Sequence, residues 1–189
     1  MSRWGIFGGS FDPPHRGHVG MAERATDDIP LDSLYLVPGY QAPLAPHPPL
    51  APARHRLAMA VLVADMRPEW HASPYEIEQR RPVPTIETVE YLRPGNSGSD
   101  PYLIIGADQA EQFDQWEQWE RLAQRVRIVC FAREDAAPAP PIAGQVRMMP
   151  YDSPLSSSQV RRRLGDGATA ADALPGAVRD YIREHRLYQ

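Results

Sequence analysis

Short apolar runs alternate with segments of helical spacing along most of this chain. Six runs have the composition of strands, at residues 4–7, 34–37, 71–77, 102–105, 126–131 and 146–149. Between them, apolar residues recur every three or four positions, as on one face of a helix, at 18–25, 54–65, 85–92 and a stretch bearing Phe113, Trp116 and Trp119. Strands separated by helices are typical of βαβ units, so the pattern predicts an α/β fold with a doubly wound parallel sheet.

The helical segment 54–65 also predicts which of its faces is buried. A broad apolar stripe is formed by Leu57, Ala58, Val61, Leu62 and Ala64. We expect this stripe to pack against the sheet.

Two further helices are predicted near the C-terminus. Residues 156–164 begin with three serines, which suit a helix start. Pro175 suits the first position of a closing helix that has Val178, Tyr181 and Ile182 on one face. We therefore expect one domain over residues 1–189, with a small helical part at about 155–189.

Proline interrupts the pattern at two places. Residues 38–52 hold six prolines in fifteen positions, so they form neither a helix nor an inner strand. We expect a stiff surface loop there. Residues 136–141 are rich in proline and alanine and are expected to form a linker.

Composition narrows the classes of partner. The chain has 189 residues, 42% apolar content and a net charge of −4, which disfavours non-specific binding to nucleic acid or anionic membrane. It lacks a long apolar span and a signal-peptide pattern, so we expect a cytoplasmic protein with a small-molecule partner. Whether it forms a homo-oligomer is left open.

All 20 basic residues are arginine, and the chain contains no lysine. This excludes a Walker A phosphate loop, a kinase strand lysine and Schiff-base chemistry. Phosphate must therefore be held by arginine, histidine, hydroxyls and backbone N–H groups. The single cysteine, Cys130, lies in an apolar run and is expected to be a buried hydrophobe.

The first candidate site is the turn from Gly8 to His18, Gly-Gly-Ser-Phe-Asp-Pro-Pro-His-Arg-Gly-His. Paired glycines allow a ligand to approach the backbone, and a helix N-terminus attracts anions. His15 and His18 are one helical turn apart, so both can face a polyphosphate. A zinc pair and two unrelated surface histidines are the alternatives, although zinc would need further ligands.

The second candidate site is the start of the helix near the C-terminus. Ser156, Ser157 and Ser158 offer hydroxyls and free N–H groups, and Arg161 lies about one turn further on. Two explanations fit this pattern equally well. The segment is either an anion cradle or a serine-rich N-cap followed by a solvated basic face.

Together the two sites resemble the signatures of the HIGH-type nucleotidyltransferase superfamily. Within it the chain is most similar to the bacterial nicotinate mononucleotide adenylyltransferases, which carry Gly-Gly-Thr/Ser-Phe-Asp-Pro-x-His-x-Gly-His. Three further segments resemble that family in the same order: 106–108 with Trp116 and Trp119, 131–133 ending in Arg133, and 178–188. The resemblance covers essentially the whole chain.

The resemblance implies adenylyl transfer from ATP to nicotinate mononucleotide, giving deamido-NAD and pyrophosphate, with Mg²⁺ accompanying ATP. It implies catalytic roles for His15, His18 and Arg161. The implied ATP-binding residues are Gly8, Gly9, Ser10, Phe11, Gly106, Asp108, Ser157 and Ser158. Thr85 and Trp116 are implied to bind nicotinate mononucleotide. Taken alone, Trp116 would be read as an ordinary core aromatic and Asp108 as a helix N-cap.

Two departures from the family concern the acceptor. The family's Pro-Pro-His-Lys is replaced by Ala42-Pro43-Leu44-Ala45, with His47 as a partial substitute, and its Ser-Tyr-Thr is replaced by Val83-Pro84-Thr85. Nicotinamide mononucleotide or phosphopantetheine therefore stay open as acceptors, and a nucleotide-binding sensor without catalysis is the alternative outside the enzymes. The pantetheine branch usually has threonine at the position of His15.

Overall fold

The computed structural model describes residues 3–44, 47–96, 100–132 and 146–189. Six parallel strands form one sheet in the order β3-β2-β1-β4-β5-β6. The strands are β1 (Trp4–Gly9), β2 (Ser33–Pro38), β3 (Trp70–Ala72), β4 (Tyr102–Gly106), β5 (Arg127–Ala132) and β6 (Val146–Pro150). Ala45, Arg133 and the predicted linker 136–141 lie outside the described residues.

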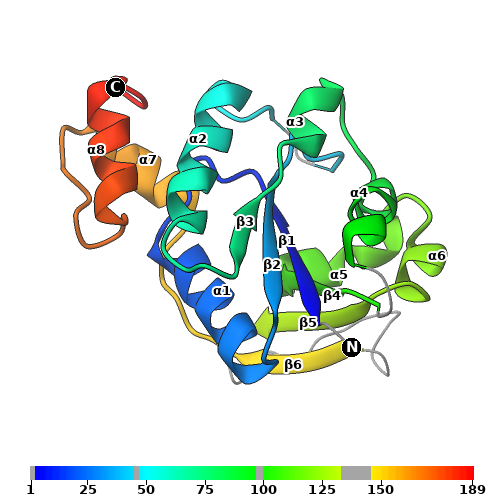
Figure 1. Cartoon of the computed structure of the whole chain (residues 1–189). Helices are drawn as coiled ribbons and strands as arrows, with labels where there is room; N and C mark the ends of the chain where they lie inside the picture. Colours follow the sequence, from blue (N-terminus) through cyan, green and yellow to red (C-terminus); the bar gives the residue numbers. More distant parts are fainter. Residues whose placement is uncertain (1–2, 45–46, 97–99, 133–145) are drawn as a thin grey trace.

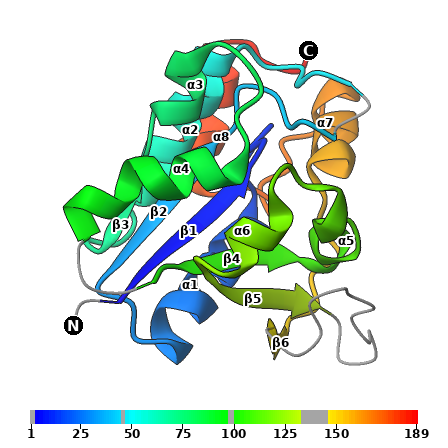
Figure 2. The same cartoon turned by 90° about the vertical axis from the view of Figure 1, so that its right-hand side faces the viewer.

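Helices cover both faces of this sheet (Figures 1 and 2). They are α1 (Arg16–Asp28), α2 (Ala53–Ala64), α3 (Tyr75–Gln79), α4 (Thr85–Leu92), α5 (Ala107–Glu111), α6 (Trp119–Ala123), α7 (Ser157–Gly165) and α8 (Gly176–Glu184), with the 3₁₀ turns η1 (Arg93–Asn96) and η2 (Phe113–Gln115). The predicted doubly wound α/β fold is confirmed. None of the helices in the described ranges is long and apolar enough to cross a bilayer.

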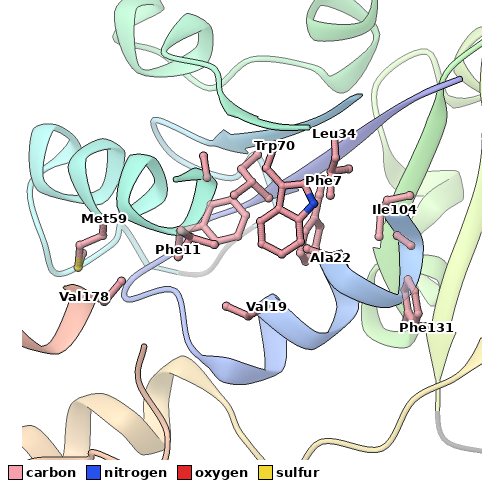
Figure 3. Packing of buried hydrophobic residues seen from close by; sticks show 14 of the residues in the cluster. Phe7, Phe11, Val19, Ala22, Leu34, Met59, Trp70, Ile104, Phe131 and Val178 are labelled. Carbon is pink, nitrogen blue, oxygen red and sulfur yellow. The ribbon is translucent and has the colours of Figure 1, made fainter. Parts of the chain in front are cut away.

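Alternate residues of each central strand enter one of two cores. One core joins Phe7 and Ile104 to α1, α2, α7 and α8, and Figure 3 shows Met59 of α2 and Val178 of α8 in it. The other joins Ile6 and Leu103 to α4, α5 and α6. Cys130 is fully buried in this second core, as predicted.

The face that α2 buries differs from the prediction. The helix turns Arg56, Met59, Ala60, Val63 and Ala64 inward and leaves the other predicted stripe residues partly exposed. This helix is apolar on most of its circumference, so spacing alone does not select a face. An arginine occupies an inward position because backbone carbonyls accept its hydrogen bonds, as described below.

Two predicted elements are broken in the structure. The run 71–77 was expected to be one strand, but β3 ends at Ala72 and α3 begins after Pro74. The aromatic stretch was expected to be one helix, but it divides into α5, η2 and α6, with Trp116 in extended conformation between them. Pro74 does not allow β3 to continue. Gln118, the residue before α6, has a left-handed backbone conformation, so the helix begins anew after it.

Candidate active site

The order of the strands fixes where a ligand can bind. β1 pairs with β2 on one side and with β4 on the other, so the connections after β1 and β4 diverge at the carboxyl end of the sheet. In open α/β sheets this divergence opens a crevice that takes ligands. Both predicted histidines follow β1 at this edge.

Two adjoining clefts occupy the crevice. We call the first the β5 cleft; its volume is about 350 Å³, and it is lined by His15, Gly17, His18, Met21, Ala107, Phe131, Ala132, Tyr151, Ser153, Leu155, Ser156 and Ser157. The second, the α7 cleft, has about 580 Å³ and is lined by Ser10, Phe11, Asp12, His18, His47, Pro48, Pro49, Leu50, Ser157, Ser158 and Arg161. His18 and Ser157 border both clefts, so a ligand passing from one to the other must pass these two side chains.

The two histidines form a close pair at the start of α1. His15 is the residue before the helix, and its backbone N–H donates to Nδ1 of His18 at 3.2 Å. The ring centroids lie 3.8 Å apart. Because Nδ1 of His18 accepts this bond, the proton of the neutral ring is on Nε2.

Both rings are neutral when the cleft holds no anion. Burial lowers the pKa of His15 to about 4, and burial together with the charge of His15 lowers the pKa of His18 well below its usual range. Nδ1 of His15 is buried and has no hydrogen-bond partner in the described part of the chain. A phosphate bound beside the pair would favour protonation of the rings.

Two glycines let other elements approach α1 closely. A Cβ at Gly17 would lie 2.8 Å from Oγ of Ser153 and 2.9 Å from the ring of His15. A Cβ at Gly20 would lie 2.1 Å from Oη of Tyr151. A larger residue at either position would therefore require Ser153, His15 or Tyr151 to shift.

The serines at α7 do not all have the same role. Ser156 is the N-cap and exchanges hydrogen bonds with Gln159, at 3.3 Å through its hydroxyl and 3.1 Å through its N–H. Ser157 donates its hydroxyl to the carbonyl of Pro13 at 3.0 Å, which joins α7 to the turn after β1. Ser156 therefore caps the helix, while Ser157 borders both clefts.

Arg161 joins the same two segments. Its Nη1 donates to the carbonyl of Asp12 at 2.8 Å, and Nη2 donates to Oγ of Ser158 at 3.1 Å. The side chain is 24% exposed, so part of the guanidinium faces the α7 cleft.

The predicted site residues fall into three groups. His15, His18, Ser10, Ser157, Ser158 and Arg161 line the clefts. Phe11 also borders the α7 cleft, but its ring is 2% exposed and packs against Phe7 and His18, at centroid distances of 5.6 and 5.3 Å. Gly8, Gly9, Gly106, Asp108, Thr85 and Trp116 line neither cleft.

Three residues of this third group, Gly8, Gly9 and Gly106, lie at the carboxyl edge of the sheet. Gly8 and Gly9 end β1, and Gly106 ends β4 and is the N-cap of α5, so the N-cap is not Asp108. Thr85 is the first residue of α4, and Trp116 packs on Phe113 with ring centroids 5.1 Å apart.

Sequence reasoning missed four residues that build the site. Arg56 and Asp12 are buried and hold the loops around the α7 cleft, Tyr151 lines the β5 cleft, and Tyr188 donates to Asp12. Asp12 lies in the motif Gly8–His18 and Tyr188 in the segment 178–188, and the resemblance of both segments to the family could have indicated a role for these residues. Arg56 gave no signal, because a charged residue on a helix is usually solvent-exposed.

His15 and His18 were also considered as a candidate zinc pair. Within the residues that the structure describes, there is no group of three or more histidine, cysteine, aspartate or glutamate side chains that could hold a metal ion.

Comparison with known proteins agrees with the fold and with the motifs. The chain is 36% identical to a probable nicotinate-nucleotide adenylyltransferase of Bordetella petrii and 30% identical to one of Bacillus pumilus, and each match covers 100% of both chains. Among solved structures, the fold resembles Plasmodium falciparum nicotinic acid mononucleotide adenylyltransferase complexed with NaAD, with a TM-score of 0.79, 18% identity and coverage of 100% and 98% of the two chains. Residues 6–163 match the model of the cytidylyltransferase-like family, and the chain therefore belongs to this family.

Proposed function

We infer that this chain is a nicotinate-nucleotide adenylyltransferase, which transfers AMP from ATP to nicotinate mononucleotide and releases pyrophosphate. One observation carries the inference: two adjoining clefts meet at His18 and Ser157, and the second of them also contains the guanidinium of Arg161. Full-length relatives that carry this activity in their names support the choice of acceptor.

The residues that line the two clefts suit the two halves of ATP. Met21, Phe131 and Leu155 give the β5 cleft apolar surface for a purine ring. Ser158 and Arg161 give the α7 cleft donors for the β and γ phosphates. The α-phosphate then lies at the junction, beside His18.

The reaction needs no nucleophile from the protein. An oxygen of the acceptor phosphate attacks the α-phosphorus in line, the bond from the α-phosphorus to the bridging oxygen breaks, and pyrophosphate leaves with the electron pair. Positioning and charge neutralisation supply the catalysis. Nε2–H of His18 donates to the α-phosphate, and His15 supports the same group.

We propose that Mg²⁺ enters with ATP. In the α7 cleft, the carboxylate of Asp12 already accepts hydrogen bonds from Leu50, Ala51 and Tyr188. Triphosphate oxygens and water are therefore the ligands that fit, as is usual for this ion. Bound there, it would neutralise charge on the triphosphate.

We propose that the acceptor lies on the α4 side of the crevice. Thr85 at the start of α4 offers its backbone N–H to the nicotinate carboxylate, and the ring of Trp116 stacks on the pyridine. Gly106 and Asp108 contact the riboses. These roles rest on the family resemblance and, for Gly106, on its position at the carboxyl edge of the sheet. Since ATP is the donor, we place the reaction in the cytoplasm.

Pyrophosphate release with MgATP and three acceptors tests the function. Nicotinate mononucleotide should give the highest kcat/KM, nicotinamide mononucleotide a lower value, and phosphopantetheine no turnover. A mock preparation without this chain serves as the blank for contaminating enzymes. Turnover with another acceptor but not with nicotinate mononucleotide would reject the assignment, and ATP binding without turnover for any acceptor would favour a sensor.

Trp116→Ala and Trp119→Ala test the acceptor side. Trp116→Ala should raise the KM for nicotinate mononucleotide about tenfold and leave the KM for ATP unchanged, because one stacking contact is lost. Trp119→Ala is the matched control. Equal effects of the two variants would show that Trp116 acts only in packing.

A further inference from the structure

The carboxylate of Asp12 is a junction between segments that are far apart in the sequence. Oδ2 accepts the backbone N–H of Leu50 at 2.8 Å, and Oδ1 accepts that of Ala51 at 3.0 Å. Oδ1 also accepts the hydroxyl of Tyr188 at 2.7 Å. Nη1 of Arg161 lies 3.7 Å from Oδ2.

These contacts connect the two opposite walls of the α7 cleft. Leu50 belongs to the proline-rich loop that forms one wall, and Arg161 belongs to the helix that forms the other. Asp12 lies between them and is 3% exposed. One buried carboxylate therefore contacts residues of both walls.

Tyr188 reaches this carboxylate through an unfavourable backbone conformation. After α8 the chain turns back, with φ of 50° at Arg186 and 65° at Tyr188. Left-handed conformations cost free energy for residues other than glycine and persist where other contacts stabilise them. The hydrogen bond to Asp12 and the packing of Tyr188 against the first core are such contacts.

We propose that Tyr188 is a positioning residue for the triphosphate: by donating to Asp12, it keeps Arg161 available to the β and γ phosphates. The proposal rests on the proposed binding of ATP in the two clefts. It does not depend on which acceptor is used.

The charges explain why a neutral donor is suited to this position. Burial, followed by the charge of Asp12, raises the pKa of Tyr188, so the hydroxyl keeps its proton and stays a donor. Without this donor, Oδ1 would keep only the N–H of Ala51. The carboxylate would then turn toward Arg161, its nearest cation, and would compete with the triphosphate for the guanidinium.

Binding of ATP and AMP to Tyr188→Phe, measured by calorimetry, tests the proposal. AMP keeps the adenosine and the α-phosphate but lacks the groups that Arg161 would hold. We expect the Kd for ATP to rise about tenfold, the scale of one hydrogen bond to a charged group, and the Kd for AMP to change less than twofold. Pyrophosphate release should show the same rise in the KM for ATP with a nearly unchanged kcat.

Tyr181→Phe is the matched control. It also removes a tyrosine hydroxyl near the C-terminus, one that lies 2.8 Å from Nδ1 of His55 and not at Asp12. It should leave the affinity for ATP unchanged. Circular dichroism melting of both variants confirms that each is folded at the assay temperature.

A second variant tests the route through Arg161. In an Arg161→Met background, Tyr188→Phe should not weaken ATP binding further, because the guanidinium it protects is gone. The proposal is overturned if Tyr188→Phe binds ATP as the unmodified chain does, if it weakens ATP and AMP equally, or if its effect persists without Arg161. The binding measurements that decide these outcomes use ATP or AMP alone, so a wrong acceptor would not obscure them.

Discussion

Replacing Arg56 by methionine should destabilise the fold more than most single substitutions. The side chain is 1% exposed, and its donors all go to backbone carbonyls. Nε donates to Ala51 at 3.1 Å, Nη1 to Ser10 at 2.9 Å and also to Gly39, and Nη2 to Tyr40 at 2.8 Å. These carbonyls belong to the turn after β1 and to the loop after β2, so one guanidinium joins both segments.

The size of the effect follows from two opposing contributions. Each carbonyl left without a donor costs about 1–3 kcal/mol if water does not replace the guanidinium. Burying the guanidinium costs desolvation energy, and this cost is the main reason that the pKa of Arg56 is lowered. The methionine variant regains that energy. Four carbonyls lose their donor and the regained desolvation energy offsets part of this cost, so we expect a net loss of about 3–5 kcal/mol.

Urea unfolding followed by circular dichroism measures this loss. A loss of about 3–5 kcal/mol should lower the melting temperature by about 6–20 °C in a chain of this size. Arg54→Met on the same helix is the control, because its side chain is exposed and should change stability by less than about 0.5 kcal/mol. A loss below about 1 kcal/mol in Arg56→Met would show that water satisfies the carbonyls and would refute the reasoning.

Three further predictions concern the crevice. His18→Ala should lower kcat about 10²- to 10³-fold in the pyrophosphate assay with an unchanged circular dichroism spectrum, since one donor to the reacting phosphate is lost; a kcat near that of the unmodified chain would contradict this role. The pKa of His15 is about 4 when folded and about 6.5 when unfolded, so the unfolded chain takes up its proton first as pH falls. The contribution of His15 to stability should therefore be fully present well above pH 6.5 and fall by about 3 kcal/mol toward pH 4, and urea titrations of His15→Gln should lack this part of the loss. Gly20→Ala should cost about 1–3 kcal/mol through overlap with Oη of Tyr151, and Tyr151→Phe in the same chain should restore part of it; no restoration would mean that the overlap is relieved elsewhere.

The parts of the fold that follow from spacing were predictable from sequence. Strands β1, β2, β4, β5 and β6 lie where apolar runs indicated them, and both phosphate motifs flank one crevice. The order of strands and helices along the chain predicts the sheet, and the rule that ligands bind at the carboxyl ends of parallel strands predicts where the motifs meet.

The remaining features depend on contacts that spacing does not encode. Which face of α2 is buried was decided by carbonyls from distant loops that accept the bonds of Arg56. The role of Tyr188 depends on a pairing across 176 residues. Trp116 was predicted to lie in a helix, but its backbone is extended.

The burial of Cys130 has a practical consequence for following the proline-rich loop. Its thiol is the only one in the sequence, it is fully buried, and burial raises its pKa to about 11, so thiol reagents should not modify the native chain at neutral pH. Leu50 is 70% exposed and borders the α7 cleft. A Leu50→Cys variant can therefore carry a single fluorescent label without removal of the native cysteine, and its emission would report directly on the loop as ATP is added.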